Sequence, residues 1–261
     1  MTEATGRVAV VTGATSGIGR EIAGRLAETG HRVYLCARSA DGLAETVKEF
    51  QERGLDVDGS TCDVSDPDQI IAFVAAAVAR YGPVDILVNN AGRSGGGITA
   101  EVTDDLWLDV VNTNLTSVFR MTKAVLTTGG MGEKKRGRIV NIASTGGKQG
   151  VLHGAPYSAS KHGVVGLTKA WGLELAKTGI TVNAVCPGFV ETPMAEKVRA
   201  HYAGIWGTTE QEAFERVTAR VPIGRYVEPS EVAAMVEYLL GDGAAAVTAQ
   251  ALNVCGGLGN Y

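Results

Sequence analysis

The stretch Val8-Ala-Val-Val-Thr-Gly-Ala-Thr-Ser-Gly-Ile-Gly19 decides the fold of this chain. Its opening run Val8–Thr12 is continuously apolar, which predicts a buried strand, and Gly17–Thr29 has the spacing of an amphipathic helix. A glycine turn between them lets the backbone approach a pyrophosphate group, to which the start of the helix offers free N–H groups. Alone this loop could be a simple turn, but its strand–loop–helix setting favours dinucleotide binding.

The same alternation of strand and helix continues along the chain. Further strands are predicted at Arg32–Ala37, up to Cys62 and Asp63, and at Val84–Asn89, Arg138–Ala143, Thr181–Cys186 and Ala251–Val254. Helices are predicted at Ala40–Arg53, Asp66–Tyr81, Thr103–Thr127, Pro156–Thr178, from Thr209 onward, and at Pro229–Leu240. Buried strands that are each followed by a helix imply a parallel sheet covered on both faces. The predicted fold class is therefore α/β, a Rossmann-type doubly wound sheet of about seven strands.

The 261 residues contain no linker, repeat or low-complexity tract, so we predict a single domain over residues 1–261. The pattern breaks once, at Val190–Arg225, between the sixth strand and the last helix. We interpret this segment as a helical insertion that covers the site, with packing alone as the alternative.

Composition excludes several classes of function. Apolar residues make up 45% and charged residues 20%, as in a globular protein, and the net charge of −4 does not suggest binding to nucleic acid or anionic membranes. No apolar run reaches 18 residues and the N-terminus lacks an apolar segment, so we expect no membrane span, no signal peptide and a cytoplasmic location. The cysteines and histidines lack metal-site spacing, which predicts no metal and buried free thiols at Cys36, Cys62, Cys186 and Cys255.

The residue that ends the second strand predicts the type of cofactor. An acidic residue there holds the ribose hydroxyls of NAD, whereas an arginine accommodates the 2′-phosphate of NADP. This chain has Cys36-Ala37-Arg38, so we predict NADPH, with a solvated arginine as the alternative. Asp63-Val64 and Asn89-Asn-Ala-Gly92 end the third and fourth strands, at the edge where open α/β sheets bind ligands.

Four polar residues form a candidate catalytic set. Tyr157 and Lys161 are four residues apart on a predicted helix, so their side chains share a face, and a cationic lysine favours the phenolate. Ser144, after the fifth strand, can hydrogen-bond a carbonyl oxygen, and Asn114 could hold a water that relays protons to Lys161. The Tyr/Lys spacing alone is common by chance. The evidence for a catalytic set is strong because four motifs follow one another in this order: the glycine loop, Asn-Asn-Ala-Gly, Ser, and Tyr-x-x-x-Lys.

These motifs, together with Pro187-Gly188 and Thr192, resemble the short-chain dehydrogenase/reductase family along the whole chain. The resemblance implies a Rossmann fold, an Asn/Ser/Tyr/Lys tetrad and usually a homotetramer. The residues that it assigns to the cofactor are Thr12, Gly13, Thr15, Ser16, Gly17, Ile18, Gly19, Arg38, Asp63, Val64, Asn90, Ala91, Gly92, Tyr157, Lys161, Pro187, Gly188, Val190 and Thr192.

Three stretches, 141–150, 185–194 and 251–261, look like the ketoreductases of aromatic (type II) polyketide synthases. This narrower resemblance implies reduction of one carbonyl, C9, of a poly-β-ketone that an acyl carrier protein holds through phosphopantetheine, in antibiotic biosynthesis. Arg38 and Arg93 would then lie near the mouth of the site and could meet the phosphate or the acidic carrier. Both are also explicable as solvated or cofactor-facing charges.

The chain departs from that subfamily after Asn-Asn-Ala-Gly-Arg, where Ser94-Gly95-Gly96 replaces Pro-Gly-Gly. Serine neither fixes φ nor removes a donor, so carry-over of stereochemistry or chain-length preference is in doubt. The candidate substrate-binding residues are Ser94, Gly95, Gly96, Thr145, Gln149, Val151, Met194, Tyr202 and Trp206. Ordinary core packing is the alternative for this pocket.

Two other functions stay open at the level of sequence. The same chemistry could act on another substrate, as in a 3-oxoacyl-carrier reductase or a steroid or sugar dehydrogenase. The chain could also be a dinucleotide-binding regulator without catalysis, although such a protein need not retain Ser144, Tyr157 and Lys161.

Overall fold

A computed structural model describes residues 6–260 of the chain. The first five residues, which belong to the N-terminus without an apolar segment, and Tyr261, which closes the C-terminal stretch of the resemblance, lie outside the described residues. Seven strands form one parallel sheet in the order β3-β2-β1-β4-β5-β6-β7. They are β1 (Val8–Thr12), β2 (Arg32–Ala37), β3 (Val57–Thr61), β4 (Ile86–Asn89), β5 (Gly137–Ile142), β6 (Ile180–Pro187) and β7 (Ala251–Val254). The predicted doubly wound sheet is confirmed.

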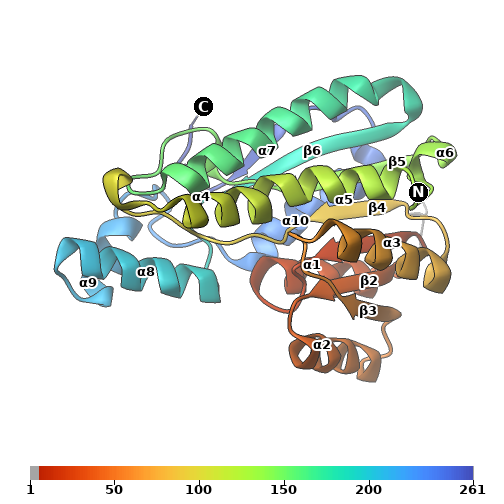
Figure 1. The fold of residues 1–261 in the computed structure, drawn as a ribbon, viewed down its shortest axis with the longest axis horizontal. Coiled ribbons are helices and arrows are strands. Elements are labelled where there is room, and N and C mark those ends of the chain that lie inside the picture. Colours follow the sequence, from red (N-terminus) through yellow and green to blue (C-terminus); the bar gives the residue numbers. More distant parts are fainter. Residues whose placement is uncertain (1–5, 261) are drawn as a thin grey trace.

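Helices cover both faces of the sheet (Figure 1). Strand β1 is buried on both sides. Its Ala9 and Val11 pack into a cluster with α1 (Gly17–Glu28) and α10 (Pro229–Leu240), and its Val8 and Val10 pack into a cluster with α3 (Pro67–Tyr81) and α5 (Ser117–Leu126). The strand order reverses between β1 and β4, and such a switch point opens a crevice at the carboxyl edge of the sheet. Helix α2 spans Ala40–Glu52.

The predicted helix Thr103–Thr127 is interrupted in its middle. It consists of α4 (Asp104–Val111), a π-helical turn (Asn112–Thr116) and α5, and these lie end to end beside α7 (Ala155–Glu174) in Figure 1. A π turn has i→i+5 hydrogen bonds, occurs mostly within α-helices and is frequent at functional sites. Here it buries Asn114 completely, which the apolar periodicity did not reveal.

The segment 190–225 contains two helices, α8 (Pro193–Trp206) and α9 (Glu210–Thr218), which project beyond the sheet in Figure 1. The predicted capping box is present, because the Thr209 and Glu212 side chains each accept from the other's backbone N–H. A bridge between Val190 and Val227 closes the base of the segment. The sequence did not predict the short helix α6 (Met131–Lys134) or the 3₁₀ turn at 176–178 that ends the predicted helix Pro156–Thr178.

The four cysteines are buried and free, as predicted. Within residues 6–260, no helix has the length and apolar character to cross a membrane. The same part of the chain contains no group of three or more His, Cys, Asp or Glu side chains that could hold a metal ion.

Candidate active site

The loop between β1 and α1 depends on its glycines. Gly13 and Gly17 have φ angles of +64° and +51°, in the left-handed region that favours glycine. A Cβ on Gly19 would overlap the Asn90 amide and the Gly13 carbonyl. The Asn90 Nδ2 donates to the backbone oxygens of Thr12 and Gly13, both at 2.9 Å. The Asn90 side chain therefore ties the end of β4 to the backbone of this loop.

Further contacts bring three neighbouring segments to this loop. Thr12 Oγ1 accepts hydrogen bonds from the N–H groups of Asn90 and Ala91, both at 3.0 Å, and Gly13 N–H donates to Cys36 O at the end of β2. Thr192 lies against Gly17, with its Cγ2 3.1 Å from an added Cβ. The ends of β1, β2 and β4 and the start of α8 thus surround the N-terminus of α1.

The groups exposed here fit a phosphorylated dinucleotide. The N-cap Ser16 of α1 makes no side-chain capping bond, so the first amides of the helix are free to bind a pyrophosphate. Arg38 is exposed just after β2 and, within residues 6–260, its guanidinium has no hydrogen bond or ion pair. A 2′-phosphate is the type of group that such an arginine binds. The residues present therefore fit NADPH.

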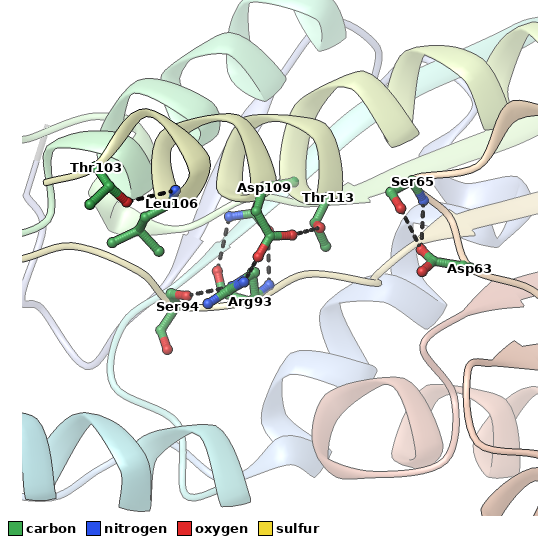
Figure 2. Close-up of polar contacts among 9 residues, drawn as sticks. Asp63, Ser65, Arg93, Ser94, Thr103, Leu106, Asp109 and Thr113 are labelled. Atoms are coloured by element: carbon green, nitrogen blue, oxygen red, sulfur yellow. Dashed lines mark hydrogen bonds and ion pairs between the residues drawn. The ribbon is translucent and has the colours of Figure 1, made fainter.

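The other predicted cofactor residues lie along the same carboxyl edge. Asp63 accepts from the N–H and hydroxyl of Ser65 in a turn after β3 (Figure 2), and Val64 is buried beside it. Gly188 follows β6 and donates to Val254 O, and Thr192 is the N-cap of α8. Half-buried Thr15 and Ile18, buried Pro187 and buried Val190 complete the set.

Tyr157 and Lys161 lie together near the start of α7, with Lys161 Nζ 5.9 Å from the centre of the phenol ring. Burial raises the pKa of the Tyr157 phenol, and a hydrogen bond with the Ser144 side chain opposes that rise. Burial lowers the pKa of Lys161 to about 8. That Lys161 favours the phenolate of Tyr157 stays a prediction; in this structure its ammonium donates to Ile142 O at 2.8 Å. Tyr157 is thus a protonated phenol at neutral pH, as a proton donor must be.

Asn114 connects the catalytic helix to the loop after β4. Its Nδ2 donates to Arg93 O at 2.9 Å and to Ser160 Oγ at 3.1 Å, and its Oδ1 accepts from Arg93 N–H at 2.8 Å. Ser160 in turn donates to Tyr157 O at 2.7 Å. The relay of protons from Asn114 to Lys161 stays a prediction, since the described bonds of this side chain serve to hold the loop. Sequence reasoning missed Ser160, although its position three residues after Tyr157 places it on the same face of the helix.

The substrate residues predicted near Ser144 lie together. An added Cβ on Gly146 would lie 2.7 Å from Val151 Cγ2, 3.2 Å from Tyr157 Cε1 and 3.3 Å from Ser144 Oγ. Gly96 lies against the carbonyl of His153, just before α7, and Gly95 lies against Val110 of α4. Thr145 is buried in the turn after Ser144, and Gln149 is half-buried in the same segment, where its N–H donates to Thr145 O at 3.0 Å.

The residues predicted on the 190–225 segment lie in different environments. Tyr202 is buried and stacks on Trp206 with 4.7 Å between ring centres and 4° between planes, while Met194 is exposed. The Arg216 guanidinium lies over the Trp206 ring, 5.7 Å from its centre. The place of Trp206 in the substrate pocket stays a prediction, with packing against Tyr202 as the alternative. Tyr202 is still close enough to the site to raise the pKa of Tyr157.

Comparison with known proteins agrees with this geometry. A family model described as short chain dehydrogenase matches residues 7–203. The chain is 76% identical to the granaticin polyketide synthase putative ketoacyl reductase 1 of Streptomyces violaceoruber, over 97% of this chain and 93% of that protein. It is 40% identical to a 3-oxoacyl-[acyl-carrier-protein] reductase of Vibrio cholerae, over 97% of each chain. The crystal structure of an actinorhodin polyketide ketoreductase variant with NADPH matches with a TM-score of 0.96 and 72% identity, over 98% of both chains.

Proposed function

The chain belongs to the short-chain dehydrogenase/reductase family of oxidoreductases, and from that premise we propose that it reduces one carbonyl of a carrier-bound poly-β-ketone with NADPH. The observation that carries this proposal is the meeting of Tyr157, Ser144 and Lys161 at the edge of the sheet that also holds the glycine loop. The degree of identity, 76% to a polyketide ketoacyl reductase against 40% to a 3-oxoacyl-carrier reductase, favours a polyketide substrate.

In this proposal, different segments at the carboxyl edge of the sheet bind different parts of NADPH. The N-terminus of α1 binds the pyrophosphate, Arg38 binds the 2′-phosphate, and Asp63 with Val64 lines the adenine side. When bound, NADPH supplies the hydride that is added to the carbonyl carbon. The relative with 72% identity was crystallised with NADPH, which supports the same cofactor here.

The chain itself supplies the proton. Ser144 holds the ketone oxygen by a hydrogen bond, and Tyr157 donates its phenolic proton to that oxygen as the alcohol forms. The buried ammonium of Lys161, whose pKa is about 8, is protonated at neutral pH and stabilises the phenolate that is left behind. One ketone, one hydride and one proton give one secondary alcohol and NADP⁺, and a proton from solvent restores the phenol.

The substrate reaches the site on a carrier protein in this proposal. The half-buried segment Ser94–Gly96, with Gln149 and Val151, borders the ketone, and C9 is the carbonyl reduced. Exposed Arg38 and half-exposed Arg93 lie where the phosphate of the carrier arm or the acidic carrier could meet them. The 190–225 segment, with Met194 exposed on α8, covers the outer side of the substrate.

We also propose that the protein is a homotetramer in the cytoplasm. Trp107, Leu108, Phe119 and Leu173 of α4, α5 and α7 expose large apolar side chains, 74% exposed in the case of Leu173. Apolar groups gathered on neighbouring helices are typical of an interface between subunits. Four buried free thiols suit a reducing compartment.

A substrate panel tests the proposed function. Purified protein is supplied with NADPH and, separately, trans-1-decalone, an acetoacetyl thioester and a steroid ketone, and oxidation of NADPH is followed. We expect the bicyclic ketone to give the highest kcat/KM. Preference for the acetoacetyl thioester would indicate a 3-oxoacyl-carrier reductase instead, and turnover of none of the ketones would indicate a non-catalytic dinucleotide binder.

A further inference from the structure

Arg93, the first residue after the Asn-Asn-Ala-Gly motif, is held through both its backbone and its side chain. Asn114 binds its N–H and its carbonyl, at 2.8 and 2.9 Å. Its guanidinium forms an ion pair with Asp109 of α4, and its Nε donates to Ser94 O at 3.1 Å (Figure 2). Two side chains of the α4 and π-helical segment therefore fix the start of the loop that carries Ser94.

The loop needs this support because its own sequence is permissive. Ser94 is followed by Gly95, Gly96 and Gly97, and glycine leaves the backbone more conformations than any other residue. Residues 90–98 have no helical or strand structure. The far end is held by one backbone bond, from Gly97 N–H to His153 O at 2.8 Å.

The same contacts relate this loop to the proton donor. Asn114 binds both Arg93 and Ser160, and Ser160 Oγ donates to Tyr157 O. A continuous set of contacts therefore runs from Asp109 through Arg93, Asn114 and Ser160 to the catalytic helix. On the outer side, Thr113 Oγ1 donates to Asp109 Oδ1 at 3.3 Å and helps to orient the carboxylate.

We propose that Asp109 is a positioning residue for the ketone: by holding Arg93, it fixes the Ser94–Gly97 loop relative to Tyr157 and so sets the face of the carbonyl that receives hydride. This inference rests on the proposed function. Asp109 does not touch the reacting atoms, because its contacts are with Arg93 and Thr113 on the outer side of the loop. Asp109 thus restrains, through Arg93, a loop that has Ser94 instead of proline.

Asp109→Asn tests the inference because it keeps the size of the side chain and removes its charge. Its matched control is Asp105→Asn, one turn earlier on α4, where an exposed aspartate has no contact with Arg93 within the described residues. Both variants are assayed with NADPH and a racemic bicyclic ketone for kcat, KM, product enantiomer ratio, NADPH Kd and thermal midpoint.

For Asp109→Asn we expect the enantiomer ratio and kcat each to fall about 10-fold, because a displacement of about 1 Å at a reacting centre can cost up to about 100-fold in rate. The NADPH Kd and the thermal midpoint should stay at wild-type values, since both charges are half-exposed and such ion pairs contribute little to stability. Asp109→Glu, which restores the charge, should recover most of the ratio. Thr113→Val should shift the ratio in the same direction by a smaller factor.

Three results would overturn the inference. The first is a wild-type enantiomer ratio in Asp109→Asn. The second is an equal change in Asp105→Asn. The third is an effect confined to the KM of phosphopantetheine-bearing substrates, which would make Arg93 a phosphate contact rather than a support for the loop. If the wild-type protein reduces none of the ketones, the proposed function fails and this inference fails with it; if the wild type is active and the variant is unchanged, only the inference fails.

Discussion

The loops 12–19 and 93–97 each contain three glycines and each follow a strand of the sheet, but they are held in different ways. In the first, Gly13 and Gly17 have positive φ angles, and an added Cβ on Gly13 would lie 2.9 Å from Ala91 Cα. In the second, no glycine has a positive φ, and the side chains of Asp109 and Asn114 hold the loop. The cofactor loop therefore needs glycine for its backbone conformation, whereas the substrate loop takes its shape from its partners, which also include the His153 carbonyl against Gly96.

The largest expected effect comes from comparing one glycine of each loop, Gly19 and Gly97. Gly19→Ala should abolish detectable NADPH binding and lower the free energy of unfolding by about 3 kcal/mol, because its Cβ would overlap Asn90 and the Gly13 carbonyl. Gly97→Ala, whose Cβ meets only Val102 Cγ2 at 3.9 Å, should change stability by less than about 0.5 kcal/mol. Urea unfolding and titration with NADPH measure both. Equal destabilisation by the two substitutions would contradict the close packing of Gly19 and the open space at Gly97.

The second prediction concerns the cost of burying Lys161. Its pKa falls from 10.5 in the unfolded chain to about 8 in the folded protein, which corresponds to about 3 kcal/mol of stability lost below pH 8. Between pH 8 and 10.5 the unfolded chain binds more protons at this group than the folded protein does, so that loss disappears as pH rises.

Lys161→Met should therefore be inactive yet more stable than the wild type at pH 7 by about 1–3 kcal/mol, less the cost of leaving Ile142 O without its partner. The difference should shrink toward pH 10.5. Urea unfolding at pH 7, 8.5 and 10 checks this, and a stability difference that does not depend on pH would contradict it.

A substitution of Arg38 tests whether the preference for NADPH over NADH depends on this side chain. Arg38→Ala should raise the KM for NADPH about 10-fold or more and leave that for NADH nearly unchanged, because only NADPH carries the 2′-phosphate. Arg20→Ala, on α1 and paired with Glu49 rather than free, is the control. A variant that retains the wild-type preference for NADPH would show that Arg38 is only a solvated charge.

The smallest expected effect comes from a substitution of Trp206, in the segment proposed to cover the outer side of the substrate. Trp206→Ala removes the ring that stacks on Tyr202, so the KM for a bicyclic ketone should rise several-fold more than that for a small ketone. Phe214→Ala, in the same α8–α9 cluster, is the control for loss of packing alone. Equal changes in both KM values would mean that Trp206 is only part of the hydrophobic core of this segment.

The two loops also differ in how far the sequence predicts them. The strand–loop–helix at 8–29 and its meeting with Asn90 follow from local spacing and from the rule that parallel strands end at one edge. The π turn at Asn112 carries no proline or glycine to mark it, and the contacts of Arg93 depend on a helix turn that only the folded chain brings near. The direction of the Tyr157 pKa shift depends on burial, which the Tyr/Lys spacing does not report.

The central claim is that Tyr157 donates the proton to a ketone of a carrier-bound polyketide. Its most direct test supplies NADPH and a carrier-bound poly-β-ketone, made by a minimal synthase, to the wild-type protein and to Tyr157→Phe, and identifies the reduced carbonyl. We predict one secondary alcohol, at C9, from the wild type, and a rate about 100- to 10,000-fold lower from the variant with unchanged NADPH binding. Reduction at the wild-type rate by Tyr157→Phe would contradict this account.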